Sequence, residues 1–251
     1  MSPELKTALE AASEAGNLAL QHFKAGITVE RKPDESPVTA ADREVEALLR
    51  ERLTSRFPEY GILGEEFGEE RKGAETRWVL DPIDGTKSFI FGVPMFAVLI
   101  GLQREGQPVL GVCNFPALGI VFYAEQGEGC FRDGEQVHVA DDENLSSSLI
   151  VCGSHAAFEM YNRAKGFRRL VQQAFATRTW GDAYGHCMVA DGRAVAMIDP
   201  VVMPYDIIPV MPIVTEAGGI VTDFQGTPWN NHSEAVSTNG RVLPHIVQAF
   251  Q

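Results

Sequence analysis

Two aspartates three residues apart follow directly on an apolar stretch, in the sequence WVLDPIDGT at residues 78–86. Carboxylates at the end of a strand offer the oxygen ligands that hard cations such as Mg²⁺ prefer. Pro82 restricts the turn, and Gly85 allows the backbone to come close to a ligand, so that N–H groups can bind an oxyanion. The same spacing also fits an acidic turn in which Asp84 or Thr86 caps a helix. A metal and phosphate site here is therefore a hypothesis that other residues must support.

Further acidic residues stand near the predicted ends of strands and starts of helices. Glu65 and Glu66 follow a strand-like run, although a solvated acidic loop also explains them. Asp206 begins an otherwise apolar helix, and Asp42 lies in the first turn of another, so a helix-capping role stays open for both. Local sequence alone does not choose between capping and chemistry at these positions.

The elements that must position these acids follow from hydrophobic periodicity. A helical period runs from Leu5 to Phe23, and a second helix starts near Thr39, where Thr39 and Asp42 have capping-box spacing. The Asp133-Gly134 pair is typical of a hairpin turn, because both central positions need positive φ. The first half of the chain is otherwise rich in β-forming runs, which predict strands at residues 60–64, 77–80, 96–102, 109–114, 120–124 and 137–139.

After residue 145 the pattern alternates between strand and helix. The predicted strands are at residues 149–152, 195–198 and 220–222, and the predicted helices at residues 156–175, 183–190 and 205–219. Pro212 lies inside the last of these helices and should bend it. The length of 251 residues suffices for two packed subdomains, which we predict at residues 1–145 and 146–251.

Composition argues against several classes of protein. The formal net charge is −13, from 21 basic and 34 acidic residues, which disfavours binding to nucleic acid and to anionic membranes. No apolar run is long enough to span a bilayer and the N-terminus does not resemble a signal peptide, so we expect a cytoplasmic protein. The four cysteines form no C-x-x-C pair and are expected to be reduced structural thiols. An acidic surface also repels a phosphorylated substrate unless metal ions neutralise some of the acids.

Three stretches resemble the signature regions of the inositol monophosphatase family. They are GEE at residues 64–66, WVLDPIDGT at residues 78–86, and Tyr205-Asp206 followed by VTEAGG at residues 214–219. Their order and spacing match the family from Ser36 to Gly219, over nearly the whole chain. The resemblance implies a mixed α+β or α/β fold, a five-layered α-β-α-β-α sandwich. It also implies a homodimer that lithium inhibits.

The resemblance assigns roles to most of the acids. It implies that the Mg²⁺ ligands are Glu65, Asp81, the carbonyl of Ile83, Asp84 and Asp206. It also implies that Gly85 and Thr86 hold the phosphate, that Glu65 with Thr86 orients and deprotonates the attacking water, and that Asp42 is an outer catalytic acid. The loop at Arg31-Lys32 resembles a mobile segment near the site. Tyr205 departs from the tryptophan of many relatives but keeps an aromatic ring.

The chemistry of phosphate esters explains such a ligand set independently. Anionic phosphate oxygens repel a nucleophile, and two or three Mg²⁺ ions, or Mn²⁺ in their place, remove that repulsion and lower the pKa of a bound water. Oxygen ligands suit Mg²⁺ better than cysteine or histidine does. We therefore expect direct attack by water on a small phosphorylated metabolite, with no covalent intermediate.

Local features resemble the histidinol-phosphatase branch of the family. They are KSF at residues 87–89, WGDAYG at residues 180–185, and Pro212. Histidinol phosphate carries a cationic amine that Asp182 and Asp199 can pair with, whereas a helix cap and a turn are their simpler roles. The predicted substrate contacts are Gly85, Thr86, Asp182, Ala183, Asp199 and Asp206.

Other interpretations stay open. Inositol monophosphate and adenosine bisphosphates are alternative substrates, and a catalytically silent metal-binding scaffold is the alternative from another class. His186 lies four residues after Asp182 on the same predicted helix, where it can approach the pocket, although a packing role is simpler.

Overall fold

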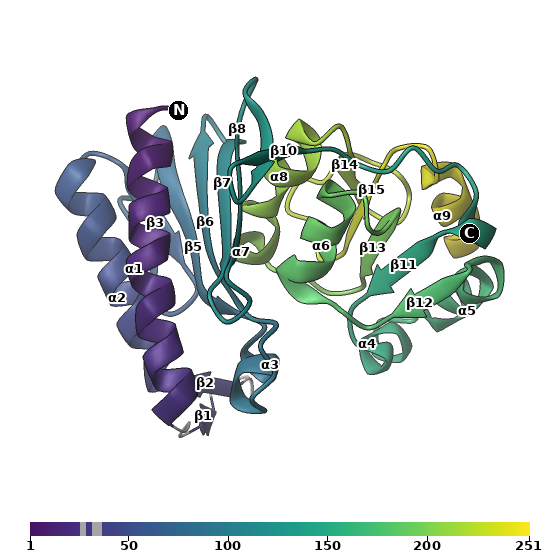
Figure 1. Ribbon diagram of the computed structural model, residues 1–251, viewed down its shortest axis with the longest axis horizontal. Helices are drawn as coiled ribbons and strands as arrows, with labels where there is room; N and C mark the ends of the chain where they lie inside the picture. The colour runs from purple at the N-terminus through teal and green to yellow at the C-terminus, as the bar shows by residue number, and fades with distance from the viewer. Residues whose placement is uncertain (26–28, 32–36) are drawn as a thin grey trace.

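The structure is a computed structural model that describes residues 1–25, 29–31 and 37–251. Five layers succeed one another across the molecule (Figure 1). Helices α1 (Pro3–Ala25) and α2 (Ala40–Arg56) cover one face of a large sheet, and α6 (Asp182–Ala190), α7 (Pro204–Ile207) and α8 (Val210–Glu216) separate it from a smaller one. Helices α4 (His155–Met160), α5 (Ala164–Gln173) and α9 (Leu243–Phe250) form the last layer. The predicted α-β-α-β-α sandwich is confirmed.

The large sheet has eight strands in the order β10-β9-β8-β7-β6-β5-β3-β4. Strand β3 runs parallel to β5, and the other pairings are antiparallel. The strands are β3 (Gly61–Gly64), β4 (Gly68–Glu70), β5 (Thr76–Asp84), β6 (Ala97–Arg104), β7 (Gln107–Phe115), β8 (Ile120–Glu125), β9 (Gly129–Arg132) and β10 (Glu135–Val137).

The hairpin between β9 and β10 turns at Asp133 and Gly134, whose φ angles are 51° and 89°, so this prediction is confirmed. Strand β9 is present in the structure but was not predicted from the sequence. The strand predicted at residues 137–139 is displaced, because only Val137 belongs to β10. Residues past the turn pair with β9 instead of extending to Val139.

The smaller sheet has five strands in the order β12-β11-β13-β15-β14. Strand β11 is parallel to both of its neighbours, whereas β15 is antiparallel to β13 and β14. The strands are β11 (Leu149–Cys152), β12 (Ala176–Arg178), β13 (Ala196–Asp199), β14 (Ile220–Thr222) and β15 (Ala235–Thr238). A separate two-stranded ribbon pairs β1 (Val29–Arg31) with β2 (Pro37–Thr39). The remaining short elements are α3 (Thr86–Ile90) and the 3₁₀ helix η1 (Leu145–Ser147).

Two predicted long helices are each divided in two. The helix predicted at residues 156–175 is interrupted at Asn162, which has a φ of 58°, and the chain resumes as α5. The helix predicted at residues 205–219 is interrupted between α7 and α8. Pro209 and Pro212 both lack the N–H that would bond the preceding turn, so the irregularity lies one turn before Pro212.

The apolar cores lie between the layers. Trp78, Phe89 and Phe96 are fully buried between the large sheet and its outer helices, and Phe158 lies in the core of the last layer. The four cysteines are buried free thiols, as predicted. The division into subdomains at residue 145 and the homodimer stay predictions. Among the described residues no helix is both long and apolar enough to cross a membrane.

Candidate active site

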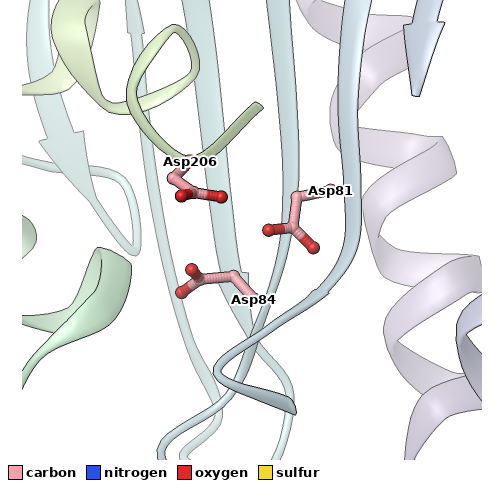
Figure 2. A group of neighbouring side chains, drawn as sticks. All are labelled: Asp81, Asp84 and Asp206. Atoms are coloured by element: carbon pink, nitrogen blue, oxygen red, sulfur yellow. The ribbon is translucent and has the colours of Figure 1, made fainter. Parts of the chain in front are cut away.

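Three carboxylates face one another at the end of β5. Asp81 and Asp84 belong to that strand and Asp206 to α7, and their oxygens approach within 4.8 Å of one another (Figure 2). Residues three apart on a regular strand point to opposite faces of the sheet. Here Asp81 pairs with Leu99 and Asp84 with Ala97, so β5 contains one extra residue in a β-bulge. The bulge brings both carboxylates to the same side.

Close packing of α7 and α8 against the large sheet places the third carboxylate. A Cβ on Gly111 of β7 would collide with the carbonyl oxygen of Pro209, and one on Gly101 of β6 would lie 3.1 Å from the Cα of Pro209. These two glycines therefore let the α7–α8 connection approach the sheet. The approach places Asp206, three residues before Pro209, beside the end of β5.

Each of the three carboxylates is oriented by one backbone N–H. Asp81 accepts from Ile83 at 3.1 Å, Asp84 from Ala183 at 2.8 Å and Asp206 from Met203 at 2.7 Å. The other oxygen of each carboxylate has no hydrogen-bond partner in the described part of the chain. Asp206 is thus not the N-cap of α7, which is Met203, but the N3 residue whose carboxylate accepts the N-cap N–H, and its other oxygen faces the cluster.

The cluster concentrates negative charge that the surrounding protein does not balance. Burial raises the pKa of Asp81 and Asp84 well above the usual carboxyl value, and neighbouring carboxylates raise both further. Burial likewise raises the pKa of Asp206 to about 7. Among the described residues lining the cavity at the cluster, Lys87 is the one cation, and it is exposed. Three acids, of which Asp81 and Asp84 are buried and Asp206 is half-buried, beside a single exposed cation fit a site for divalent cations with oxygen ligands.

The predicted ligands and phosphate contacts line one cavity of about 220 Å³. Its lining comprises Glu65, Asp81, Ile83, Asp84, Gly85, Thr86, Lys87, Asp182 and Asp206. The Thr86 hydroxyl donates to the Ile83 carbonyl at 3.1 Å. Gly85 has a φ of 79°, and a Cβ there would lie 3.0 Å from the Met95 carbonyl oxygen. A side chain at residue 85 would therefore be strained and crowded.

A buried ion pair on α2 holds the loop that carries Glu65. The Glu46 carboxylate is fully buried and accepts the N–H groups of Glu66 at 2.7 Å and Phe67 at 3.2 Å. Arg50 donates to Glu46 at 2.8 Å and to the Gly68 carbonyl at 2.6 Å. Sequence reasoning missed this pair, although a glutamate and an arginine four residues apart on a helix are within reach of each other.

Asp42 caps α2. Its Oδ2 accepts the N–H and the hydroxyl of Thr39 at 2.7 and 2.6 Å, which confirms the predicted capping box. Burial raises the pKa of the Asp42 carboxyl, and the Glu65 charge adds to the rise. Asp42 does not line the cavity at the cluster, so its catalytic role stays a prediction. Lys32 of the predicted loop at Arg31-Lys32 lies outside the described residues, as does Ser36, where the family resemblance begins.

A second, larger cavity of about 410 Å³ adjoins the first. Both cavities are lined by Asp84, Lys87, Asp182 and Asp206. Helices α4 and α6, the end of β13 and the loops after β11 and β13 complete the wall of the larger one, and they contribute Gly153, Ser154, Ala183, His186, Asp199 and Val201 among others. An ester whose phosphate lies at the acid cluster therefore has room for its alcohol portion next to it.

Two further carboxylates face this larger cavity. Asp182 is exposed at the start of α6, with a φ of 56°, and no capping hydrogen bond to its carboxylate occurs within the described part of the chain. Asp199 receives a 3.4 Å hydrogen bond from the Val201 N–H, in agreement with its turn role. Burial and the Asp182 charge raise the pKa of Asp199. The cap explanation fails for Asp182, while Asp199 has both a turn contact and a place at the cavity.

His186 also lines the larger cavity. The side chain is 2% exposed, its Nδ1 lies 2.7 Å from the Ser237 hydroxyl, and burial lowers its pKa to about 4. The ring is therefore neutral near pH 7. The prediction that His186 can approach the pocket is confirmed.

Known proteins resemble the chain over its whole length. The model of the inositol monophosphatase family matches residues 1–251. The histidinol-phosphatase of Chlorobaculum parvum is 44% identical over all of this chain and 97% of that protein, and that of Streptomyces coelicolor is 36% identical over 97% of this chain and 95% of that protein. The solved structure of an IMPase from Thermotoga maritima superposes with a TM-score of 0.92 at 30% identity, covering 99% of this chain and 97% of that one. The chain belongs to the inositol monophosphatase family.

Proposed function

We propose that this protein is a Mg²⁺-dependent phosphomonoesterase that converts L-histidinol phosphate and water to L-histidinol and phosphate, a step of histidine biosynthesis. The observation that carries the proposal is the unbalanced cluster of Asp81, Asp84 and Asp206 at the edge of a second cavity with two more carboxylates. Relatives named histidinol-phosphatase support the choice of substrate. Such a role implies a cytoplasmic enzyme, and the family resemblance implies a homodimer.

The residues of the first cavity have separate roles in metal binding and in activation of the attacking water. Glu65, Asp81, Asp84, Asp206 and the Ile83 carbonyl would hold two or three Mg²⁺ ions, with Mn²⁺ as a substitute. The bound ions would neutralise the phosphate oxygens and make water more acidic. Glu65 accepts the proton of the attacking water. Because the Thr86 hydroxyl donates its hydrogen to Ile83, its oxygen is an acceptor that can orient that water.

Binding of the substrate draws on both cavities. The backbone N–H groups of Gly85 and Thr86 hold the phosphate near the acid cluster. Asp182 and Asp199 bind the cationic amine of the alcohol portion in the larger cavity, because charge-assisted hydrogen bonds are stronger than neutral ones. Inositol 1-phosphate, whose alcohol portion has only neutral hydroxyls, is the second candidate, and the likeness to the Thermotoga maritima IMPase favours it.

An Asp182→Asn variant separates amine binding from phosphate binding. Asparagine tolerates positive φ and keeps the side-chain size, so the fold is retained. We expect kcat/KM for L-histidinol phosphate to fall about 10-fold or more, and that for inositol 1-phosphate to change by less than about 3-fold. Phosphate release measured with both esters checks this, and equal losses on the two would remove Asp182 from amine recognition.

Release of phosphate from L-histidinol phosphate by the wild-type protein tests the function itself. We expect turnover with Mg²⁺, none after treatment with EDTA, and recovery when Mg²⁺ is added back in excess. Turnover that EDTA leaves unchanged would contradict a metal-dependent reaction, and no turnover with either ester would contradict both candidate substrates.

A further inference from the structure

His186 is a buried polar group that the proposed reaction leaves without a role. One ring nitrogen, Nδ1, bonds the hydroxyl of Ser237, which is itself fully buried on β15. The other, Nε2, has no hydrogen-bond partner in the parts of the chain that the structure describes. Since Nδ1 is engaged in the core and His186 lines the larger cavity, Nε2 is the nitrogen available to a ligand there.

The position of His186 relative to Asp182 matches the shape of the proposed alcohol. The two residues are four apart on α6 and both line the larger cavity. The φ of 56° at Asp182 departs from regular helix geometry, but both side chains line the same cavity of about 410 Å³. In L-histidinol the amine and the imidazole ring are joined through two carbon atoms. An amine at Asp182 therefore leaves the ring of the same molecule within reach of His186.

The protonation state of His186 suits a neighbour of a cationic amine. Burial lowers the pKa of its ring to about 4, so that His186 stays neutral and does not repel the substrate. A neutral imidazole offers one donor and one acceptor, and the bond to Ser237 decides which of them Nε2 presents. The imidazole of the substrate also carries one donor and one acceptor, so it can satisfy either tautomer.

We propose that His186, oriented by Ser237, is a specificity-determining residue that hydrogen-bonds the imidazole ring of the leaving alcohol. The inference rests on the proposed function, and it adds recognition of the ring to recognition of the amine. A hydrogen bond from His186 would make the enzyme distinguish substrates by the nitrogen atoms of the ring and not only by the size of the ring.

Two phosphate esters and four variants, one of them a control, test this contact. L-Phenylalaninol phosphate keeps the phosphate, the amine and a ring of similar size but has no ring nitrogen. His186→Asn retains a polar atom near the position of Nδ1 and loses the one near Nε2, whereas His186→Gln retains a polar atom near Nε2. Asp182→Asn is the matched control, since it weakens amine binding alone. Ser237→Ala removes only the hydroxyl that orients the ring.

The readout is the preference ratio, which is kcat/KM for L-histidinol phosphate divided by kcat/KM for L-phenylalaninol phosphate. We expect a wild-type ratio of about 10 or more, because a site built to hydrogen-bond a group discriminates against an analogue that lacks it. His186→Asn should bring the ratio close to 1, His186→Gln should retain more of it, and Ser237→Ala should lower it in part. Asp182→Asn should lower both kcat/KM values and leave the ratio unchanged.

Failure of the inference can be told apart from failure of the proposed function. A wild-type ratio near 1, or a His186→Asn variant with the wild-type ratio, overturns the role of His186 while turnover of L-histidinol phosphate sustains the function. Wild-type protein that hydrolyses inositol 1-phosphate but neither amino-alcohol ester overturns both. If one His186 variant fails to fold, the preference ratios of the other His186 variant and of Ser237→Ala still decide the role of His186.

Discussion

Replacing Glu65 by glutamine is expected to lower kcat about 10²- to 10⁴-fold at saturating Mg²⁺, the range that removal of a general base commonly costs. The amide keeps the size of the side chain but cannot take the proton of the attacking water. The loop itself is held through backbone N–H groups by Glu46, so the variant should keep its fold. Phosphate release under saturating substrate, with circular dichroism and a thermal melt on the same sample, measures both effects.

Glu66→Gln is the matched control for this variant. Glu66 is the next residue of the same loop and does not line the cavity at the acid cluster. Its kcat should stay within about 3-fold of wild type, in the range expected for a change away from the reacting atoms. Near wild-type turnover by Glu65→Gln would show that another group takes the proton.

An Asp81→Asn variant is expected to gain stability without metal and to lose its response to metal. Burial raises the pKa of Asp81, and the negative charges of Glu65, Asp84 and Asp206 raise it further. A neutral amide at residue 81 therefore relieves repulsion in the metal-free protein. At a Mg²⁺ concentration 100 times its Kd, binding should stabilise the wild type by about 2.7 kcal/mol. The variant should lack this increase, and its turnover should fall at least about 100-fold.

Thermal melts with EDTA and with Mg²⁺ measure these two effects separately from activity. For a chain of this size, about 1 kcal/mol corresponds to a Tm change of about 2–4 °C. Asp142→Asn removes the same charge at an exposed position and should keep the wild-type response to Mg²⁺. A metal-free Asp81→Asn protein that melts below the wild type, or that still gains stability from Mg²⁺, would contradict the proposed metal site.

Much of the fold was predictable because local pattern and tertiary structure agree. The capping box at Thr39 and Asp42, the turn at Asp133 and Gly134, and helix α6 follow from rules that act within a few residues. Two long helices were predicted where four shorter ones occur. At Asn162 a positive φ interrupts the predicted helix, and hydrophobic periodicity does not report the backbone conformation of a single residue.

The candidate site was predictable as a set of residue types but not as a geometry. The bulge in β5, which turns Asp81 and Asp84 to one side, is visible only in the register with β6. The approach of Pro209 to Gly101 and Gly111 joins segments about 100 residues apart, and no local pattern encodes it. The pair of His186 with Ser237 is likewise a contact across 51 residues.

Competition between two substrates shows which phosphate ester the protein hydrolyses preferentially. Equal concentrations of L-histidinol phosphate and inositol 1-phosphate in one reaction with Mg²⁺, followed by phosphorus NMR, give the ratio of the two kcat/KM values from their relative rates of loss. We expect L-histidinol phosphate to disappear first, with a ratio of about 10 or more, because Asp182 and Asp199 offer charge-assisted bonds to its amine. Faster loss of inositol 1-phosphate would contradict the proposed substrate.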